Sequence, residues 1–225
     1  MGARVFVWLG GALFAASFGL CAWSYASVMG RVTPPAGWQG WATDALLITV
    51  FALHHSVFAR ESVKDWLARR LPAPLLRSLY VWVASLLLIL VSLLWQPIGG
   101  ELYAITGLPA LALLAMQLAG LWLAARAAAR IDPLELAGIR PPRPTNGLQV
   151  NGPFRWVRHP LYLGWVLMVF GTAHMTGDRL AFAAMTTCYL VVAIPLEERS
   201  LRRSFGEDYA RYARAVRWRL IPFIY

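Results

Sequence analysis

Six long stretches without a charged residue constrain this chain more than any other feature of its sequence. They cover residues 5–30, 45–59, 78–100, 102–125, 159–177 and 180–196. A helix crosses the hydrocarbon core of a bilayer with about 17–25 mostly apolar residues, and the run 45–59 reaches that length when residues 41–44 precede it. The sequence therefore predicts an all-α fold, a polytopic membrane helical bundle of about six transmembrane helices.

The positive charges fall almost entirely on one side of this predicted bundle. Of the 21 Lys and Arg residues, 19 lie at the first terminus, in the connections 60–77 and 126–158, and in the tail 197–225, which alternate along the six spans. The positive-inside rule then predicts cytoplasmic termini, and we expect a bacterial inner-membrane protein. Contact with anionic membrane lipids accounts for the net charge of +10, so no nucleic-acid partner is expected. The oligomeric state is left open.

The chain is predicted to be a single membrane domain, residues 1–225, with N-terminal helices at 1–100 on the substrate side and a cofactor-binding region at 140–225. The runs 159–177 and 180–196 are expected to form a tight antiparallel hairpin, closed by residues 174–179. A C-terminal amphipathic helix should follow, because apolar residues recur every three or four positions from Leu201 to Val216, with Gly206 inside the pattern. Cys21 and Cys188 lie in apolar runs, which predicts two buried thiols and no metal site.

Ionisable residues at the edge of a membrane span are candidates for function, and three groups stand out. They are Arg158-His159-Pro160-Leu161-Tyr162, the pair Glu197-Glu198, and His54-His55 with Arg60 shortly beyond. Each group also has a purely structural interpretation. The arginine would be a membrane anchor, the glutamates would pair with Arg202 or Arg203 one turn later, and the histidines would be hydrogen-bonded in the core.

The predicted hairpin favours a functional interpretation, because it places the first and second groups side by side. His159 and Tyr162 would face Glu197 and Glu198 beneath the Pro/Gly-rich loop 140–153. Such a cavity offers a helix N-terminus for an anion, carboxylates for hydroxyl groups or a cation, and aromatic rings. A nucleotide-like cofactor with a carboxylate, a ribose and a positive centre would fit, and S-adenosylmethionine has these three parts.

These two blocks resemble a known family of membrane enzymes. The segment Asn151-Gly-Pro-Phe-x-x-x-Arg-His-Pro-x-Tyr-x-Gly164, followed by Glu197-Glu198-x-x-Leu201-x-x-x-Phe205-Gly206-x-x-Tyr209-x-x-Tyr212 and a closing Ile221-Pro222, is similar to the isoprenylcysteine carboxyl methyltransferases and phospholipid methyltransferases. The resemblance covers residues 145–225 and implies a helical-hairpin pocket for S-adenosylmethionine. The implied cofactor contacts are Leu148, Gln149, Val150, Phe154, His159, Pro160, Tyr162, Glu197 and Glu198.

The acceptor is less clear than the cofactor. The isoprenylcysteine enzymes carry an Arg one turn before the Glu pair to hold the substrate carboxylate, whereas this chain has Ala193 there. The stretch LHHSVFAR resembles instead the methanethiol S-methyltransferase branch, which implies a small lipophilic thiol, with His55 or Arg60 as the catalytic group that activates it. Carboxyl methylation of an isoprenylcysteine-like substrate and N-methylation of a phospholipid remain alternatives.

Two further alternatives come from other functional classes. Membrane sterol reductases that use NADPH share a block similar to residues 158–162 and a similar C-terminal ending, although they are much longer than this chain. A non-catalytic membrane accessory protein would retain the fold without turnover. Binding of S-adenosylmethionine or of NADPH separates these possibilities.

Overall fold

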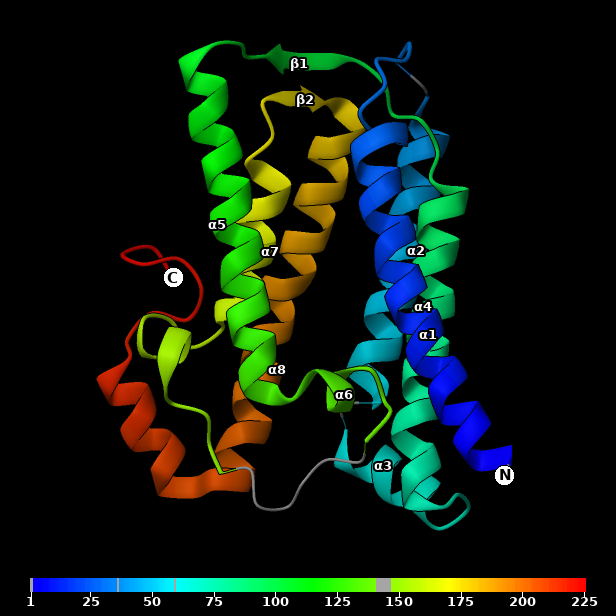
Figure 1. Ribbon diagram of the computed structural model, residues 1–225, viewed down its shortest axis with the longest axis vertical. Helices are drawn as coiled ribbons and strands as arrows, with labels where there is room; N and C mark the ends of the chain where they lie inside the picture. Colours follow the sequence, from blue (N-terminus) through cyan, green and yellow to red (C-terminus); the bar gives the residue numbers. More distant parts are fainter. Residues whose placement is uncertain (1, 36, 59, 141–146) are drawn as a thin grey trace. The chain divides into compact units, whose positions relative to one another are not determined.

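The computed structural model describes residues 2–35, 37–58, 60–140 and 147–225, and helices dominate these ranges (Figure 1). Within them, five helices are long and apolar enough to cross a membrane. They are α1 (Gly2–Trp23, extended by a π-helical turn at Ser24–Val28), α2 (Trp38–Phe58), α4 (Ala73–Leu94), α5 (Leu108–Ile131) and α8 (Gly177–Ala215). The prediction of a helical membrane bundle is confirmed.

The remaining elements are short. They are α3 (Glu61–Ala68), α6 (Pro133–Leu136), a 3₁₀ turn (Gly152–Arg155), α7 (Pro160–Phe170), and the strands β1 (Glu101–Ala104) and β2 (His174–Thr176), which pair with each other. The predicted span 159–177 is wrong in length, because α7 has only 11 residues. At about 1.5 Å per residue, such a helix reaches roughly half of the hydrocarbon thickness.

The chain forms two compact units, which are described separately. Unit 1 contains Met1–Leu102, Pro133–Pro142 and Thr176–Ala181. Here α1 and α4 pack closely because Gly10 leaves room for the ring of Trp82, whose Nε1 would lie 2.7 Å from an added Cβ. The same Nε1 donates a hydrogen bond of 3.1 Å to the carbonyl of Phe6, and the two rings stack 5.4 Å apart.

A buried carboxylate organises one end of unit 1. Asp178 is 3% exposed and accepts three hydrogen bonds, from Nε1 of Trp95 at 2.8 Å and from the backbone N–H groups of Ile98 and Gly99 at 3.0 Å each. The next residue, Arg179, donates to two backbone carbonyls of the π-helical turn that extends α1. The start of α8 is thus fixed to the connection that follows α4.

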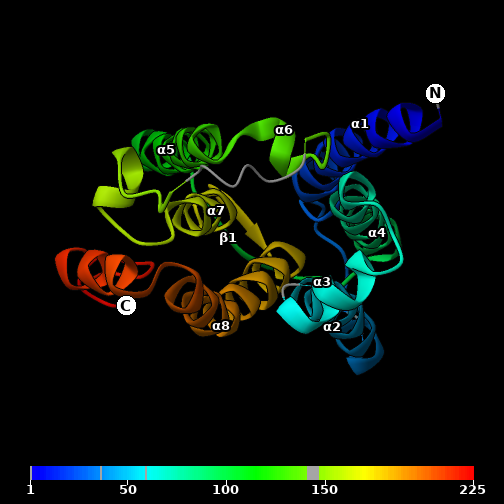
Figure 2. The same cartoon turned by 90° about the horizontal axis from the view of Figure 1, so that it is seen from below.

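Unit 2 contains Tyr103–Asp132, Arg143–Met175 and Phe182–Tyr225. Its central contact is between α5 and α7, which lie side by side in both views (Figures 1 and 2). A Cβ added to Gly164 would meet the carbonyl oxygen of Gly120 at 2.6 Å and the backbone nitrogen of Ala124 at 2.8 Å. Small residues therefore allow these two backbones to touch, as is common between membrane helices.

The antiparallel pairing of α7 with α8 is carried by side chains. Trp165 donates from Nε1 to Thr186 at 3.1 Å, and Tyr162, one turn earlier, donates from its hydroxyl to Glu197 at 2.9 Å. The α8 partner rises in number as the α7 residue falls, so the two helices run in opposite directions. The predicted hairpin is present in this sense, but its connection contains β2 and its first helix is short.

The last part of α8 turns away from the rest of the helix at Gly206 (Figure 1). Gly206 has φ 51° and ψ −124°, a conformation that strongly favours glycine because a Cβ would strain the backbone. The predicted C-terminal helix is thus a separate segment. Its aromatic residues Tyr209 and Tyr212 are only 1% and 8% exposed, so its apolar face packs into the protein.

Two arginines tie the chain's last residues to the start of α7. Arg158 donates from Nε to Glu198 at 2.7 Å, while its Nη1 bonds three backbone carbonyls between residues 213 and 217. Arg219 lies 3.3 Å from the other oxygen of Glu198. Burial lowers the pKa of Arg219, but its hydrogen bond to Tyr225 and the Glu198 charge raise that pKa overall. The expectation that Arg158 is only a membrane anchor is wrong, because its side chain is 8% exposed.

The two thiols differ in their environment. Cys21 is buried, as predicted, whereas Cys188 is exposed on α8, so the expectation of two buried thiols is wrong for the second residue. A residue in an apolar run of a membrane protein can face either lipid or the protein core, so the run alone does not predict that its thiol is buried.

We predict that Gly164→Val destabilises the fold by about 1–3 kcal/mol, because the added methyl groups overlap the α5 backbone. Gly19→Val is the matched control, since Gly19 also lies in a predicted span but has no atom within 4 Å of its added Cβ. Thermal unfolding of the purified protein in detergent measures both. Equal effects of the two substitutions would contradict the close contact between α5 and α7.

We also predict that Arg158→Met costs about 3–5 kcal/mol, because it removes one of the two cations that partner the buried Glu198. Adding Glu198→Gln to this variant should restore part of the loss. Arg214→Met serves as the control, because its pair with Glu207 is exposed and solvent screens it. If the Arg158 and Arg214 variants unfold at the same temperature, the buried pair does not hold the C-terminal segment.

Candidate functional site

The site in unit 2 is built on the N-terminus of α7. His159 is the residue before the helix, and its carbonyl accepts the first helical hydrogen bond, from Leu163 at 3.1 Å. Pro160 occupies the first helical position, where its missing N–H costs nothing and its fixed φ suits the helix. Backbone N–H groups of Arg158 and His159 donate to the carbonyls of Trp218 and Arg219, each at 2.9 Å. The C-terminal segment therefore fixes where α7 begins.

His159 lies between two carboxylates. Its Nδ1 is 3.5 Å from Glu197 and its Nε2 is 3.5 Å from Glu198, and the side chain is 5% exposed. The imidazole stacks on Tyr162 with a centroid distance of 5.5 Å and an angle of 9° between the planes. Tyr162 in turn donates its hydroxyl hydrogen to Glu197. Four predicted residues from two helices thus form one connected cluster.

The two adjacent glutamates have different surroundings. Glu198 is 4% exposed and is held by Arg158 and Arg219, whereas the Glu197 side chain is 44% exposed and contacts Tyr162 and His159. Successive residues on a helix point about 100° apart, which separates them. The possibility that this pair bonds Arg202 or Arg203 is wrong for Glu198. Glu197 is the carboxylate that solvent and a ligand can reach.

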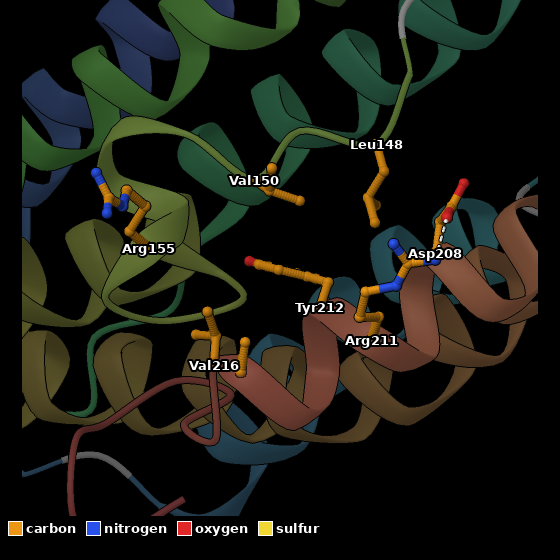
Figure 3. Close-up of a pocket in the computed structure, with 8 residues that line it drawn as sticks. Leu148, Val150, Arg155, Asp208, Arg211, Tyr212 and Val216 are labelled. Atoms are coloured by element: carbon orange, nitrogen blue, oxygen red, sulfur yellow. Dashed lines mark hydrogen bonds and ion pairs between the residues drawn. The ribbon is translucent and has the colours of Figure 1, made fainter.

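A cavity of about 650 Å³ lies between the segment before the 3₁₀ turn and the last segment of α8 (Figure 3). Leu148 and Val150 reach into it from the chain segment before the 3₁₀ turn, and the ring of Tyr212 points toward them from the last segment of α8. The full lining is Leu148, Val150, Arg155, Asp208, Arg211, Tyr212, Ala215 and Val216. A volume of this size is typical of sites that hold a cofactor or drug-sized molecule.

One contact connects the cavity lining to an ionic partner of Glu198, and another connects it to the 3₁₀ turn before α7. Arg158 donates to the carbonyl of Val216, which lines the cavity, and Tyr212 donates its hydroxyl hydrogen to the carbonyl of Phe154 at 2.8 Å. The second bond joins the last segment of α8 to the 3₁₀ turn that precedes α7. The predicted residue Phe154 therefore contributes its backbone to the site.

The sequence prediction missed several residues that form this site. Arg155, Asp208 and Arg211 line the cavity, and Arg211 pairs with Asp208 at 3.3 Å. Tyr212 belongs to the motif that resembles the family and to the apolar face of the C-terminal helix, but it is not among the predicted cofactor contacts. The repeating pattern that Tyr212 shares with Tyr209 predicts that it packs against the protein. No local pattern indicates that the Tyr212 hydroxyl donates to the carbonyl of Phe154.

The remaining predicted residues lie in two places. Pro160 is buried at the first position of α7, and Gln149 is half-buried between the two lining residues Leu148 and Val150 without lining the cavity itself. His55 and Arg60 belong to unit 1, where His55 lies in the last turn of α2 and the exposed Arg60 precedes α3. Residues 141–146 of the predicted roof, 140–153, lie outside the described ranges.

Several known proteins similar to this chain are methyltransferases. The family model described as phospholipid methyltransferase matches residues 136–208. A methanethiol S-methyltransferase of Crocosphaera subtropica is 38% identical over 190 residues, which is 80% of this chain and 74% of that protein. The corresponding enzyme of Mycobacterium tuberculosis is 34% identical over 195 residues, covering 82% and 79% of the two chains.

A more distant similarity is confined to part of the chain. The protein-S-isoprenylcysteine O-methyltransferase A of Arabidopsis thaliana is 35% identical over 74 residues, or 32% of this chain and 38% of that protein. No solved structure gives a significant match. The long alignments, the family model and the five apolar helices agree with the resemblance seen in the sequence. The chain therefore belongs to the methanethiol S-methyltransferase family and is an integral-membrane methyltransferase.

Proposed function

We propose that this protein transfers a methyl group from S-adenosylmethionine to a small lipophilic thiol and so forms a thioether. One observation carries the choice of acceptor. The alignments with methanethiol S-methyltransferases cover about four fifths of the chain and must include much of its N-terminal half, whereas the isoprenylcysteine alignment covers about one third. The N-terminal helices are where we place the acceptor.

The donor assignment is supported by the chemistry of the site in unit 2. The cavity of about 650 Å³ combines apolar walls with Arg155, whose guanidinium suits a carboxylate, and with the ion pair of Arg211 and Asp208. Glu197 offers an accessible oxygen next to an aromatic ring, which suits hydroxyl groups or a cation. S-adenosylmethionine carries a carboxylate, ribose hydroxyls and a positive sulfonium, so the residues present fit this molecule.

We propose that the cofactor contacts come from the segment Leu148–Val150, from Phe154, from His159 before α7, from Pro160 and Tyr162 of α7, and from Glu197. Glu198 contributes indirectly in this proposal, because its two arginines fix the backbone around His159. When bound, S-adenosylmethionine supplies a methyl group that its positive sulfur already activates. The protein then has to align the acceptor, exclude water and remove the thiol proton.

A thiol fits this chain better than a carboxylate does. Ala193 stands one helical turn before Glu197, where the resembling isoprenylcysteine enzymes place an arginine. A carboxylate in a dry pocket without a cation would cost several kcal/mol, whereas a small apolar thiol carries no such penalty. We propose His55 and Arg60, at the end of α2, for the acceptor side of the reaction.

We propose that both termini face the cytoplasm of a bacterium and that the protein lies in the inner membrane. The asymmetric distribution of Lys and Arg supports this orientation. The cavity and the Glu197 cluster would then open toward the compartment in which S-adenosylmethionine is made. The lipophilic acceptor would reach the protein from the bilayer.

The donor proposal predicts that Glu197→Gln weakens binding of S-adenosylmethionine by about 10-fold or more, because a charge-assisted hydrogen bond contributes about 1.5–3 kcal/mol. Glu207→Gln is the control, since Glu207 also lies on α8 but pairs with Arg214 on the surface. Isothermal titration calorimetry of both variants gives the affinities. Unchanged affinity for Glu197→Gln would remove this residue from the proposed site.

The acceptor proposal predicts methylated thiols, and no methylated amines or carboxylates, when labelled S-adenosylmethionine is offered with a panel of the three classes. Mass spectrometry of the products gives the answer. A methyl ester of a prenylated cysteine would favour carboxyl methylation. Methylated phosphatidylethanolamine would favour N-methylation of a phospholipid. If NADPH stabilises the protein and S-adenosylmethionine does not bind, a reductase is favoured. If neither molecule binds, a non-catalytic accessory protein is favoured.

A further inference from the structure

A stripe of rings at the end of α2 has no part in the cofactor site. Phe51, His54, His55 and Phe58 recur at three- and four-residue spacing, which places them on one face of the helix. This face packs on Tyr80 of α4 within unit 1. His54 stacks on the Tyr80 ring with centroids 5.1 Å apart and 20° between the planes, and His55 meets the same ring edge-on at 5.4 Å.

The two histidines of this stripe differ in what their nitrogens contact. His55 donates from Nδ1 to the carbonyl oxygen of Phe51, one turn earlier, at 3.1 Å. Both ring nitrogens of His54 are buried, and neither has a hydrogen-bond partner among the residues that the structure describes. A buried polar group without a partner costs about 1–3 kcal/mol, so proteins rarely keep one without a use.

Aromatic rings surround His54, and a cation lies over one of them. Phe58 lies 4.5 Å from the His54 ring and His55 lies 5.6 Å from it, measured between centroids. The guanidinium of Arg77 sits over Tyr80 at 5.3 Å and donates to the carbonyl of Glu135 at 3.1 Å, which holds it in place. Aromatic faces bind sulfur and small alkyl groups well, and a nearby cation favours a thiolate.

We propose that His54 is the catalytic residue that accepts the proton of the thiol, and that Phe58 and Tyr80 hold the thiol's alkyl group beside it. This inference rests on the proposed S-methylation. The S–H bond breaks and its proton goes to a ring nitrogen of His54. The sulfur electron pair forms the new S–CH₃ bond, while the bond between the methyl group and the donor's sulfonium breaks and its electrons stay with the donor.

The structure favours His54 over its neighbour for a simple reason. A neutral imidazole has one N–H and one lone pair, and a thiol bound at His54 would give that lone pair the partner it lacks. His55 already uses Nδ1 to bond its own helix. The prediction for His55 and the inference for His54 therefore give different outcomes when each residue is replaced.

His54→Phe is the informative substitution, because it keeps the ring stack and removes the two unpartnered nitrogens. We expect an equal or higher unfolding temperature and unchanged affinity for S-adenosylmethionine, together with a fall in kcat/KM for ethanethiol of about 100-fold or more, the usual contribution of a general base. His55→Phe is the matched control. It loses the bond to Phe51, so we expect a lower unfolding temperature and a smaller fall in kcat/KM.

A series of thiols of increasing acidity tests the role in proton transfer. A thiol that is already ionised at the assay pH needs no base, so the loss in His54→Phe should shrink to less than about 10-fold with an acidic aryl thiol. An equal loss with all thiols would overturn the proton-transfer role. Ethanethiol methylation within 3-fold of the unchanged protein would overturn the assignment. If the unchanged protein methylates no thiol, the proposed function itself fails.

Discussion

The buried carboxylate of Glu198 joins three segments of unit 2 that are far apart in the sequence. Arg158 approaches one of its oxygens from the residue pair before α7, and Arg219 approaches the other from the end of the chain. A buried charge requires such partners, because an unpaired ion in a dry interior costs several kcal/mol. The start of α7, the end of α8 and the C-terminal segment are consequently fixed together, and the candidate cofactor site lies where they meet.

The neighbouring Glu197 depends on this arrangement. Since Glu198 satisfies the two arginines, Glu197 is left to contact Tyr162 and His159 and remains partly open to solvent. The bend at Gly206 then directs the last segment of α8 back over the chain near Phe154, where Tyr212 closes one wall of the cavity. Of these two adjacent residues, Glu198 stabilises the fold, whereas Glu197 is accessible to a ligand.

The family assignment gives these contacts a chemical setting. Methyl transfer to a small acceptor needs little from the protein beyond alignment, removal of a proton and exclusion of water. The described structure offers features for binding the donor and for removing a proton in separate units: a cavity and a reachable carboxylate in unit 2, and a ring-lined histidine in unit 1. Sequence similarity over most of the chain to methanethiol S-methyltransferases covers both units.

Local sequence features predict the membrane helices of this protein and some of their boundaries. Uncharged runs must be helical in a bilayer because backbone groups need internal partners, and Pro160 and Gly206 mark a helix start and a bend through their own backbone preferences. The resemblance to known methyltransferases implied that His159, Tyr162 and Glu197 belong to one site. The burial of Arg158 and the different environments of the two adjacent glutamates depend on partners about 20 to 60 residues away. Only folding brings such partners together, because burial and hydrogen bonding are properties of the packed chain.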